Sequence, residues 1–344
     1  MPLFYFSSAI LSLHPRDVFR ISRQNEEVVH NIWLQAKAEE VVGFGEASPN
    51  PFYAESAEDV QRRLEGLNVH FQELEIETVE DLRLIHERAW PFLCPSRAAQ
   101  CALDIALWDW FAKKNGRSVA AMALGKKAAP VRSCCTIGLS SPGELERKVA
   151  ELQGYPAIKI KMDRSADLSA VRYVRERSAA SISVDANCAW EDVDVAKISQ
   201  ALAKLGVNFI EQPLPPAQNE RMPDILADSA LPIVADESCV TREDVEAMRG
   251  RFSGFNIKLV KCGGITTGLE MLRRGQELGL KTMIGCMLES SVLIAAGAVL
   301  GQETDFADLD GAWLLRDDPF NGLSFEKGIL SLPDVPGLGV ELRK

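Results

Sequence analysis

A repeated unit in the second part of the chain constrains the fold most. From about residue 130, short β-branched or apolar runs alternate with helical patterns that end in Gly or Pro. The predicted strands are 131–138, 156–161, 181–185, 207–211, 232–236, 254–258, 281–285 and 304–310. Strands that alternate with helices lie parallel in one sheet, and eight units spaced roughly 25 residues apart favour a closed barrel over an open sheet. We therefore predict an α/β fold of the TIM-barrel type.

The first part of the chain has a different pattern. Residues 1–13 and 28–47 resemble meander strands, and 57–67, 79–90 and 96–116 have helical patterns. Ser96 and Gly116 suit the two ends of the last helix. We predict an α+β capping domain over 1–125 and a barrel over 126–311. Residues 312–344 show no further unit and are expected to complete the capping domain.

Composition excludes several classes of protein. The net charge of −11 disfavours nucleic acid and anionic membranes as partners. No apolar run approaches the ~18 residues of a membrane span, and the start lacks the basic stretch of a secretory signal. The eight cysteines form no CxxC pair, which indicates free thiols in a reducing compartment. We expect a cytoplasmic protein, and the sequence leaves open whether it forms a homo-oligomer.

Two lysines stand in an apolar predicted strand, YPAIKIKMD. Residues two apart share a face of a strand, so Ile158 and Ile160 are expected to face the helices. Lys159 and Lys161 then point into the barrel. Because a lone lysine pair in a strand usually marks a solvated edge, the interpretation depends on negative partners nearby.

Those partners occur at the ends of the following strands. Five successive strands end in Lys161, Asp185, Glu211, Asp236 and Lys258, at intervals of 24, 26, 25 and 22 residues. One acid at a strand end often only caps the next helix. Five charges at the barrel period, however, meet at the C-terminal mouth, where barrel enzymes carry out their chemistry.

Three carboxylates at one mouth require a cation between them. All four histidines lie within the first 86 residues, so oxygen ligands remain, and these favour Mg²⁺ over zinc. Lys161 and Lys258 flank the expected metal. One lysine would remove a proton α to a carboxylate, Mg²⁺ would stabilise the enediolate, and the other lysine would return a proton. Lys159 and the metal are expected to lower the pKa of Lys161.

A second acidic pair follows in ADLDGAWLL. Asp308 and Asp310 are two residues apart on the eighth predicted strand, so both carboxylates share a face. They either cap a turn or bind a cation at the mouth. A substrate ammonium group would serve as that cation.

The order KIK, VDAN, IEQP, ADES and NIKLVKCGG resembles the muconate-lactonising branch of the enolase superfamily. GFGEASP (43–49) and ALDIALWD (102–109) extend the resemblance into the capping domain. It implies a modified (β/α)7β barrel, Mg²⁺ on Asp185, Glu211 and Asp236, and Lys161 and Lys258 as the acid/base pair. The mandelate-racemase branch of the superfamily uses a His–Asp base instead, and this barrel has no histidine.

The branch includes several activities. In its dipeptide epimerases a D-x-D at the eighth strand binds the substrate ammonium, so the resemblance implies Mg²⁺-dependent epimerisation of dipeptides at the C-terminal residue's α-carbon. The alternatives are o-succinylbenzoate synthase and N-acylamino acid racemase, or a barrel retained for binding alone. Thr136, Cys286 and Leu288 match positions that line the dipeptide, and Lys159 is expected beside the substrate.

Side-chain specificity is expected from capping loops at 16–25 and 49–56. Arg23, with Arg20 as a second choice, would read the Glu side chain of an L-Ala-D/L-Glu substrate. Tyr53 and Glu55 are expected to face the same region, where Glu55 would instead favour a cationic or amide-bearing dipeptide.

Overall fold

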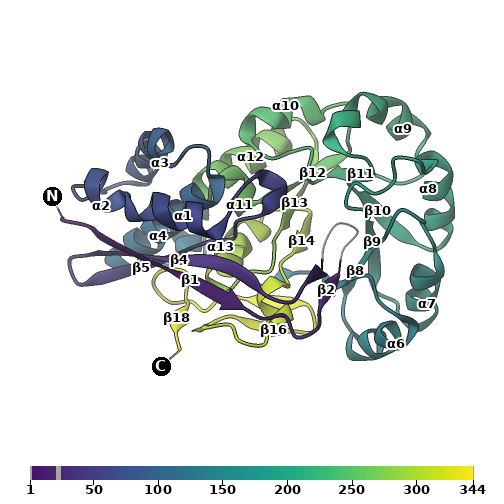
Figure 1. The fold of residues 1–344 in the computed structure, drawn as a ribbon, viewed down its shortest axis with the longest axis horizontal. Coiled ribbons are helices and arrows are strands. Elements are labelled where there is room, and N and C mark those ends of the chain that lie inside the picture. The colour runs from purple at the N-terminus through teal and green to yellow at the C-terminus, as the bar shows by residue number, and fades with distance from the viewer. Residues whose placement is uncertain (1, 21–24, 344) are drawn as a thin grey trace.

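A computed structural model describes residues 2–20 and 25–343 (Figure 1). The N-terminal part contains an antiparallel sheet in the order β1 (Tyr5–Leu13), β4 (Val29–Ala38), β5 (Val41–Ala47). The short strands β2 (Phe19–Arg20) and β3 (Asn25–Glu26) pair beside it, at the end nearest the barrel. The helical elements of this part are η1 (Pro51–Tyr53), α1 (Ala57–Glu65), α2 (Leu67–His70), α3 (Val79–Leu93), α4 (Arg97–Lys114) and α5 (Val119–Leu124).

Helix α4 is the core of this part and lies directly on β5. Ser96 caps its start by accepting a hydrogen bond from the Ala99 N–H, and Gly116 follows its end at a φ of 61°. Gly43 and Gly45 permit the close approach of strand and helix. A Cβ at Gly45 would lie 1.9 Å from the carbonyl oxygen of Ala102. The α+β character predicted for this region is confirmed.

The barrel sheet contains eight parallel strands in chain order. Cys134 N–H donates to Ala307 O (2.9 Å) and so links the first barrel strand to the last. The last strand is followed by a 3-10 turn, η4 (Gly311–Leu314), which confirms the (β/α)7β form. The strands are β7 (Cys135–Ile137), β8 (Ala157–Lys161), β9 (Ser181–Asp185), β10 (Val207–Glu211), β11 (Ile233–Ala235), β12 (Gly254–Lys258), β13 (Lys281–Gly285) and β14 (Phe306–Asp308).

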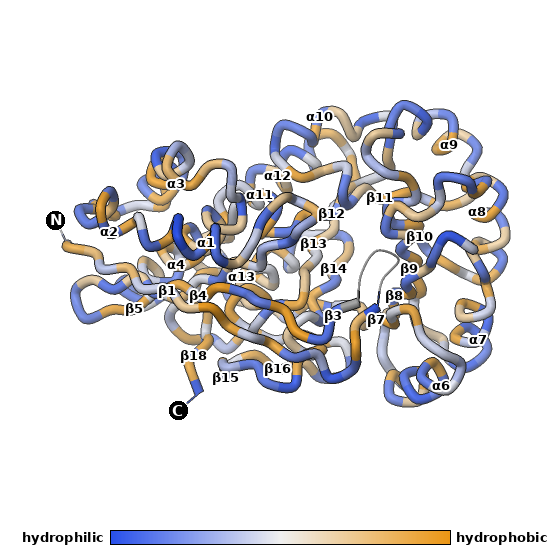
Figure 2. Tube along the Cα trace, viewed as in Figure 1, coloured by the Kyte–Doolittle hydropathy of each residue, from blue (hydrophilic) through white to orange (hydrophobic). Residues whose placement is uncertain are grey.

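Helices surround this sheet, and those far from the N-terminal part carry hydrophilic residues along their length (Figure 2). Helix α13 differs, because Ser291 to Leu300 are all buried between the barrel and the N-terminal part. No helix in the described ranges is long and apolar enough to cross a lipid bilayer. The elements are α6 (Pro142–Glu151), α7 (Ser169–Arg177), α8 (Val195–Lys204), η2 (Pro216–Arg221), α9 (Met222–Asp228), η3 (Arg242–Asp244), α10 (Val245–Met248), α11 (Leu259–Cys262), α12 (Ile265–Glu277) and α13 (Ser291–Gly301).

The prediction of one strand over 131–138 is wrong. β6 (Val131–Arg132) pairs with β17 (Ile329–Ser331) of the C-terminal segment, and only β7 joins the barrel. The chain changes partner at Ser133, whose N–H donates to Gly328 O (2.9 Å). The same segment contacts the N-terminal part, since Leu338 N–H donates to Asp109 Oδ1 on α4 (2.7 Å). Its other strands are β15 (Phe320–Asn321), β16 (Ser324–Glu326) and β18 (Glu341–Leu342).

Candidate active site

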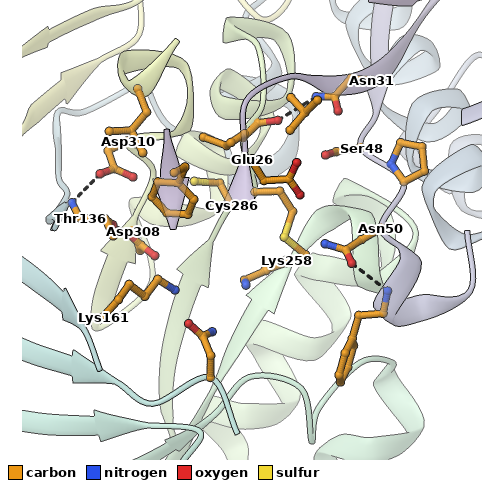
Figure 3. A pocket seen from close by; sticks show the side chains of 18 of the residues that line it. Glu26, Asn31, Ser48, Asn50, Thr136, Lys161, Lys258, Cys286, Asp308 and Asp310 are labelled. Atoms are coloured by element: carbon orange, nitrogen blue, oxygen red, sulfur yellow. Dashed lines mark hydrogen bonds between the residues drawn. The ribbon is translucent and has the colours of Figure 1, made fainter. Parts of the chain in front are cut away.

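A cavity that opens to solvent lies between the barrel mouth and the N-terminal part, with about 890 Å³ of empty space including its open side (Figure 3). Its floor carries the charged residues of the barrel strands, and its roof comes from β2, β3, β4 and the segment around η1. The barrel side includes Thr136, Lys159, Lys161, Lys258, Cys286, Leu288, Asp308 and Asp310, and the roof includes Phe19, Glu26, Val29, Asn50 and Tyr53.

Lys161 and Lys258 lie on opposite sides of this cavity, and their ammonium groups point toward one another (Figure 3). Each contacts a carboxylate at the end of the neighbouring strand. Lys161 Nζ donates to Asp185 Oδ2 (2.6 Å), and Lys258 Nζ donates to Asp236 Oδ2 (2.7 Å). Strand alternation explains the orientation of Lys161, because Ile160 beside it is buried in the apolar core.

Three carboxylates lie beneath the lysines and are at most 1% exposed: Asp185, Glu211 and Asp236. Asp185 and Glu211 are the last residues of β9 and β10, and Asp236 directly follows β11, the next strand in the sheet. Glu211 stands opposite Asp185 in the sheet. Burial and then the charge of Asp185 raise the pKa of Glu211 to about 7. Burial alone would also raise the pKa of Asp185 and Asp236, but their lysine partners lower both. The three acids therefore need cationic charge to remain ionised together.

Within the described ranges, no three His, Cys, Asp or Glu side chains are arranged to hold a metal ion. Lysine ammonium groups contact the carboxylates instead, and Lys159 Nζ lies 3.4 Å from Glu211 Oε2 and 3.7 Å from Asp185 Oδ2. A cation thus already stands between two of the three acids. An all-oxygen donor set is the type that Mg²⁺ prefers, so the residues present fit this metal.

Asp308 and Asp310 both line the cavity, as their spacing predicts. Asp308 forms an ion pair with Lys159 and accepts hydrogen bonds from Thr136 Oγ1 (3.2 Å) and Cys134 Sγ (3.1 Å). Lys159 therefore reaches across the barrel and already provides a cation for one of the two acids. Asp310 accepts from the Thr136 N–H (2.6 Å). Burial and the charge of Asp308 raise the pKa of Asp310 to about 7.

The predicted specificity residues have different outcomes. Tyr53 lines the cavity. Glu55 does not, because its carboxylate accepts from Ser96 Oγ (2.7 Å) and Ala98 N–H (3.0 Å) at the start of α4. A helix N-terminus stabilises such a carboxylate, which explains its orientation. Arg20 forms an ion pair with Glu144 on α6 (3.1 Å), and Arg23 lies outside the described residues.

Two neighbours of the carboxylates were missed by the prediction. Asn256 Nδ2 on β12 donates to Glu211 Oε1 (2.8 Å), and Lys261 Nζ donates to Asp236 Oδ1 (2.7 Å). Neither residue stands at the end of a barrel strand, so the spacing of charged strand ends could not predict them. A signal for Lys261 existed in NIKLVKC, since this lysine comes one helical turn after Lys258.

The N-terminal part also holds one wall of the cavity. The fully buried Glu46 accepts from Ser290 N–H (2.9 Å), Ser290 Oγ (2.5 Å) and Asn31 Nδ2 (2.8 Å). Asn31 Nδ2 also donates to Leu288 O (2.9 Å). The GFGEASP stretch therefore anchors the segment between β13 and α13, which places Cys286 and Leu288 at the cavity.

Comparison with protein families identifies the family to which the chain belongs. Residues 7–125 match the mandelate racemase / muconate lactonizing enzyme N-terminal domain, and residues 144–344 match the enolase C-terminal domain-like family. The chain belongs to this enolase-like family, which confirms the superfamily inferred from the charged strand ends.

The individual proteins that the chain is similar to include several epimerases. The L-Ala-D/L-amino acid epimerase of Flavobacterium johnsoniae is 35% identical over 331 residues, covering 96% of this chain and 97% of the relative. The L-Ala-D/L-Glu epimerase of Escherichia coli is 34% identical over 319 residues, covering 91% and 95%. The crystal structure of a dipeptide epimerase from Enterococcus faecalis, complexed with Mg and L-Leu-L-Tyr, superposes with a TM-score of 0.89 at 27% identity, covering 99% of both chains.

Proposed function

We propose that this protein is a Mg²⁺-dependent dipeptide epimerase that inverts the α-carbon of the C-terminal residue. One observation carries the proposal. Two lysines, Lys161 and Lys258, face each other across the cavity, and each donates to one of the carboxylates buried behind it, Asp185 and Asp236. The third buried carboxylate, Glu211, stands beside Asp185 in the sheet. Inversion requires a proton to leave one face of a carbon and another to arrive on the opposite face, and two opposed bases suit that chemistry.

The proposed roles follow from the contacts. Asp185, Glu211 and Asp236 would hold Mg²⁺, whose charge offsets the negative charge that develops on the substrate carboxylate. Lys161 and Lys258 would exchange protons with the α-carbon. Each lysine now donates to a proposed ligand, so each must give up that contact before it can act as a base.

Substrate orientation would come from the far side of the cavity. Asp308 and Asp310 would receive the N-terminal ammonium group of the dipeptide, with Lys159 holding Asp308 in place. Thr136 fixes Asp310 through its backbone N–H, and Cys286 and Leu288 would form the wall along the peptide. Names of full-length relatives that act on L-Ala dipeptides support this substrate class. Arg23 as the reader of a Glu side chain stays a prediction.

We further propose the domain limits predicted above, with a capping domain of 1–125 and 312–344 and a barrel of 126–311. The eight cysteines are all free thiols, which supports a cytoplasmic location. Small dipeptides are the proposed partners, with no nucleic acid or membrane partner, and a homo-oligomer is compatible with this fold.

Proton exchange tests the proposed activity. The protein is incubated in D₂O with Mg²⁺ and pooled L,L-dipeptides, and deuterium is read by mass spectrometry. We expect one deuteron at the α-carbon of the C-terminal residue, and no incorporation after EDTA treatment, because the metal supplies most of the stabilisation of the deprotonated substrate.

A matched pool of N-acetylated amino acids and o-succinylbenzoate precursors serves as the control. Exchange or turnover confined to that pool would contradict the dipeptide assignment and favour an acylamino acid racemase or o-succinylbenzoate synthase. Mg²⁺ binding without exchange in either pool would indicate a barrel that only binds ligands.

A further inference from the structure

Lys261 is a buried lysine that the proposed proton transfers do not use. It lies on α11, one helical turn after Lys258, and is 2% exposed. Its ammonium group lies within hydrogen-bond distance of four oxygens: Asp236 O (2.6 Å), Asp236 Oδ1 (2.7 Å), Cys239 O (3.0 Å) and Asn256 O (3.0 Å). An ammonium group has three N–H donors, so these oxygens use all of them. Lys261 therefore has no donor left for a substrate.

The two oxygens of the Asp236 carboxylate have different partners. Oδ2 contacts Lys258, which lines the cavity, whereas Oδ1 contacts Lys261, which does not line it. Lys261 also binds the backbone oxygen of the same residue. This two-point contact fixes the rotation of the carboxylate and presents Oδ2 on the cavity side.

The same ammonium group connects two of the proposed metal ligands. Lys261 binds the backbone oxygen of Asn256, and the side chain of Asn256 donates to Glu211 Oε1 (2.8 Å). The Lys261 ammonium group therefore joins the ends of β11 and β12: it contacts Asp236 on one side and Asn256, the partner of Glu211, on the other. Lys261, Asp236, Asn256 and Glu211 are at most 2% exposed, so these contacts are made away from bulk water.

We propose that Lys261 is a positioning residue for the metal site: it holds the Asp236 carboxylate in the orientation that binds Mg²⁺ and takes no part in proton transfer. This inference rests on the proposed function, because it assumes that Asp236 is a metal ligand. It adds a second role for lysine at the mouth. In this account Lys258 gives up its contact with Asp236 when it acts as a base, whereas Lys261 keeps its contact throughout.

The test compares Lys261→Met with Lys113→Met. Lys113 provides the match, since it also donates to a buried carboxylate, Asp109 Oδ2 (2.6 Å), and to a backbone oxygen, but lies on α4 away from the mouth. Mg²⁺ affinity is measured by titration calorimetry without substrate, and thermal unfolding is measured in EDTA. Both variants should unfold at lower temperature than the wild type. We expect Lys261→Met to weaken Mg²⁺ binding at least tenfold and Lys113→Met to change it less than twofold.

Three outcomes are decisive. A folded Lys261→Met variant that binds Mg²⁺ as tightly as the wild type would overturn the inference and leave the proposed function intact. Failure of the wild-type protein to bind Mg²⁺ would overturn the proposed function as well. Where Lys261→Met does not fold, Lys261→Arg keeps the buried charge but replaces a point donor with a planar fork. We expect at least threefold weaker Mg²⁺ binding from it, and wild-type affinity in this variant would also overturn the inference.

Discussion

At the scale of single residues, the barrel mouth is a set of charges compensated in pairs. Lys161 contacts Asp185, Lys258 and Lys261 share Asp236, and Lys159 contacts Asp308. Buried charges are tolerated only when they are paired. Asp310, like Glu211, has a raised pKa: burial is the main cause, and the nearby charge of Asp308 adds to it. A substrate ammonium group would relieve that repulsion.

Asp310→Asn should therefore weaken the binding of dipeptides that carry a free ammonium group. Loss of one charge-assisted contact in a buried site costs roughly 2 kcal/mol, or about a 30-fold rise in KM, while kcat should fall less. Steady-state epimerisation rates over a range of dipeptide concentrations provide the measurement. N-acetylated dipeptides are the control, since they carry no ammonium group, and an equal rise in KM for them would contradict the assignment.

At the scale of elements, the close contact between β5 and α4 supports one wall of the site. β5 carries both Gly45, which lies against α4, and Glu46, which holds the wall at Ser290. The strand alternates between these two tasks because successive side chains point to opposite faces.

Gly45→Ala should be strongly destabilising. The added Cβ would meet the Ala102 carbonyl oxygen at 1.9 Å, and backbone on both sides cannot move without separating the two elements. We expect a loss of about 3 kcal/mol or more in the free energy of unfolding, measured by urea denaturation. Gly143→Ala is the control. Its Cβ would meet nothing within 4 Å, and because alanine is favoured over glycine in a helix, stability should stay the same or rise. A loss above about 0.5 kcal/mol there would question the steric argument.

Elements whose signals are local were predictable from the sequence. β9, β10, β12 and β13 have the predicted bounds, because each is a short apolar run that ends at a charge or a glycine. The split between β6 and β7 was not predictable, since it depends on pairing with β17, about 200 residues later. The contact of Lys159 with Asp308 spans 149 residues and forms only when the barrel closes. Local patterns contain no information on such partners.

At the scale of the whole molecule, the site exists only where the two parts meet, and this junction buries acids as well as apolar groups. Glu289 is 3% exposed beside the cavity wall. Burial, opposed by a hydrogen bond from the Met287 N–H and increased by the charge of Glu46, raises the pKa of Glu289 to about 8. The raised pKa keeps the Glu289 carboxyl protonated to a higher pH in the folded protein than in the unfolded chain, where its pKa has the ordinary value of 4.5.

Stability in the absence of metal should consequently fall as the pH rises toward 8. Between the two pKa values the folded state binds more protons than the unfolded state, so the free energy of unfolding decreases by up to about 1.4 kcal/mol per pH unit for this group. Urea denaturation in EDTA at several pH values across this window gives the slope. Glu289→Gln should make the slope shallower by about 1 kcal/mol per unit, and an unchanged slope would show that Glu289 is ionised in the folded protein.

The central claim is that Lys161 and Lys258 exchange protons on opposite faces of one carbon. The most direct measurement follows deuterium incorporation from D₂O into each of the two epimers of an accepted dipeptide, with wild type, Lys161→Ala and Lys258→Ala. We predict that the wild type labels both epimers and that each variant loses epimerisation by at least about 100-fold. Any residual exchange in a variant should be confined to one epimer, the opposite one in the other variant. Epimerisation at near wild-type rate in either variant would contradict the two-base account.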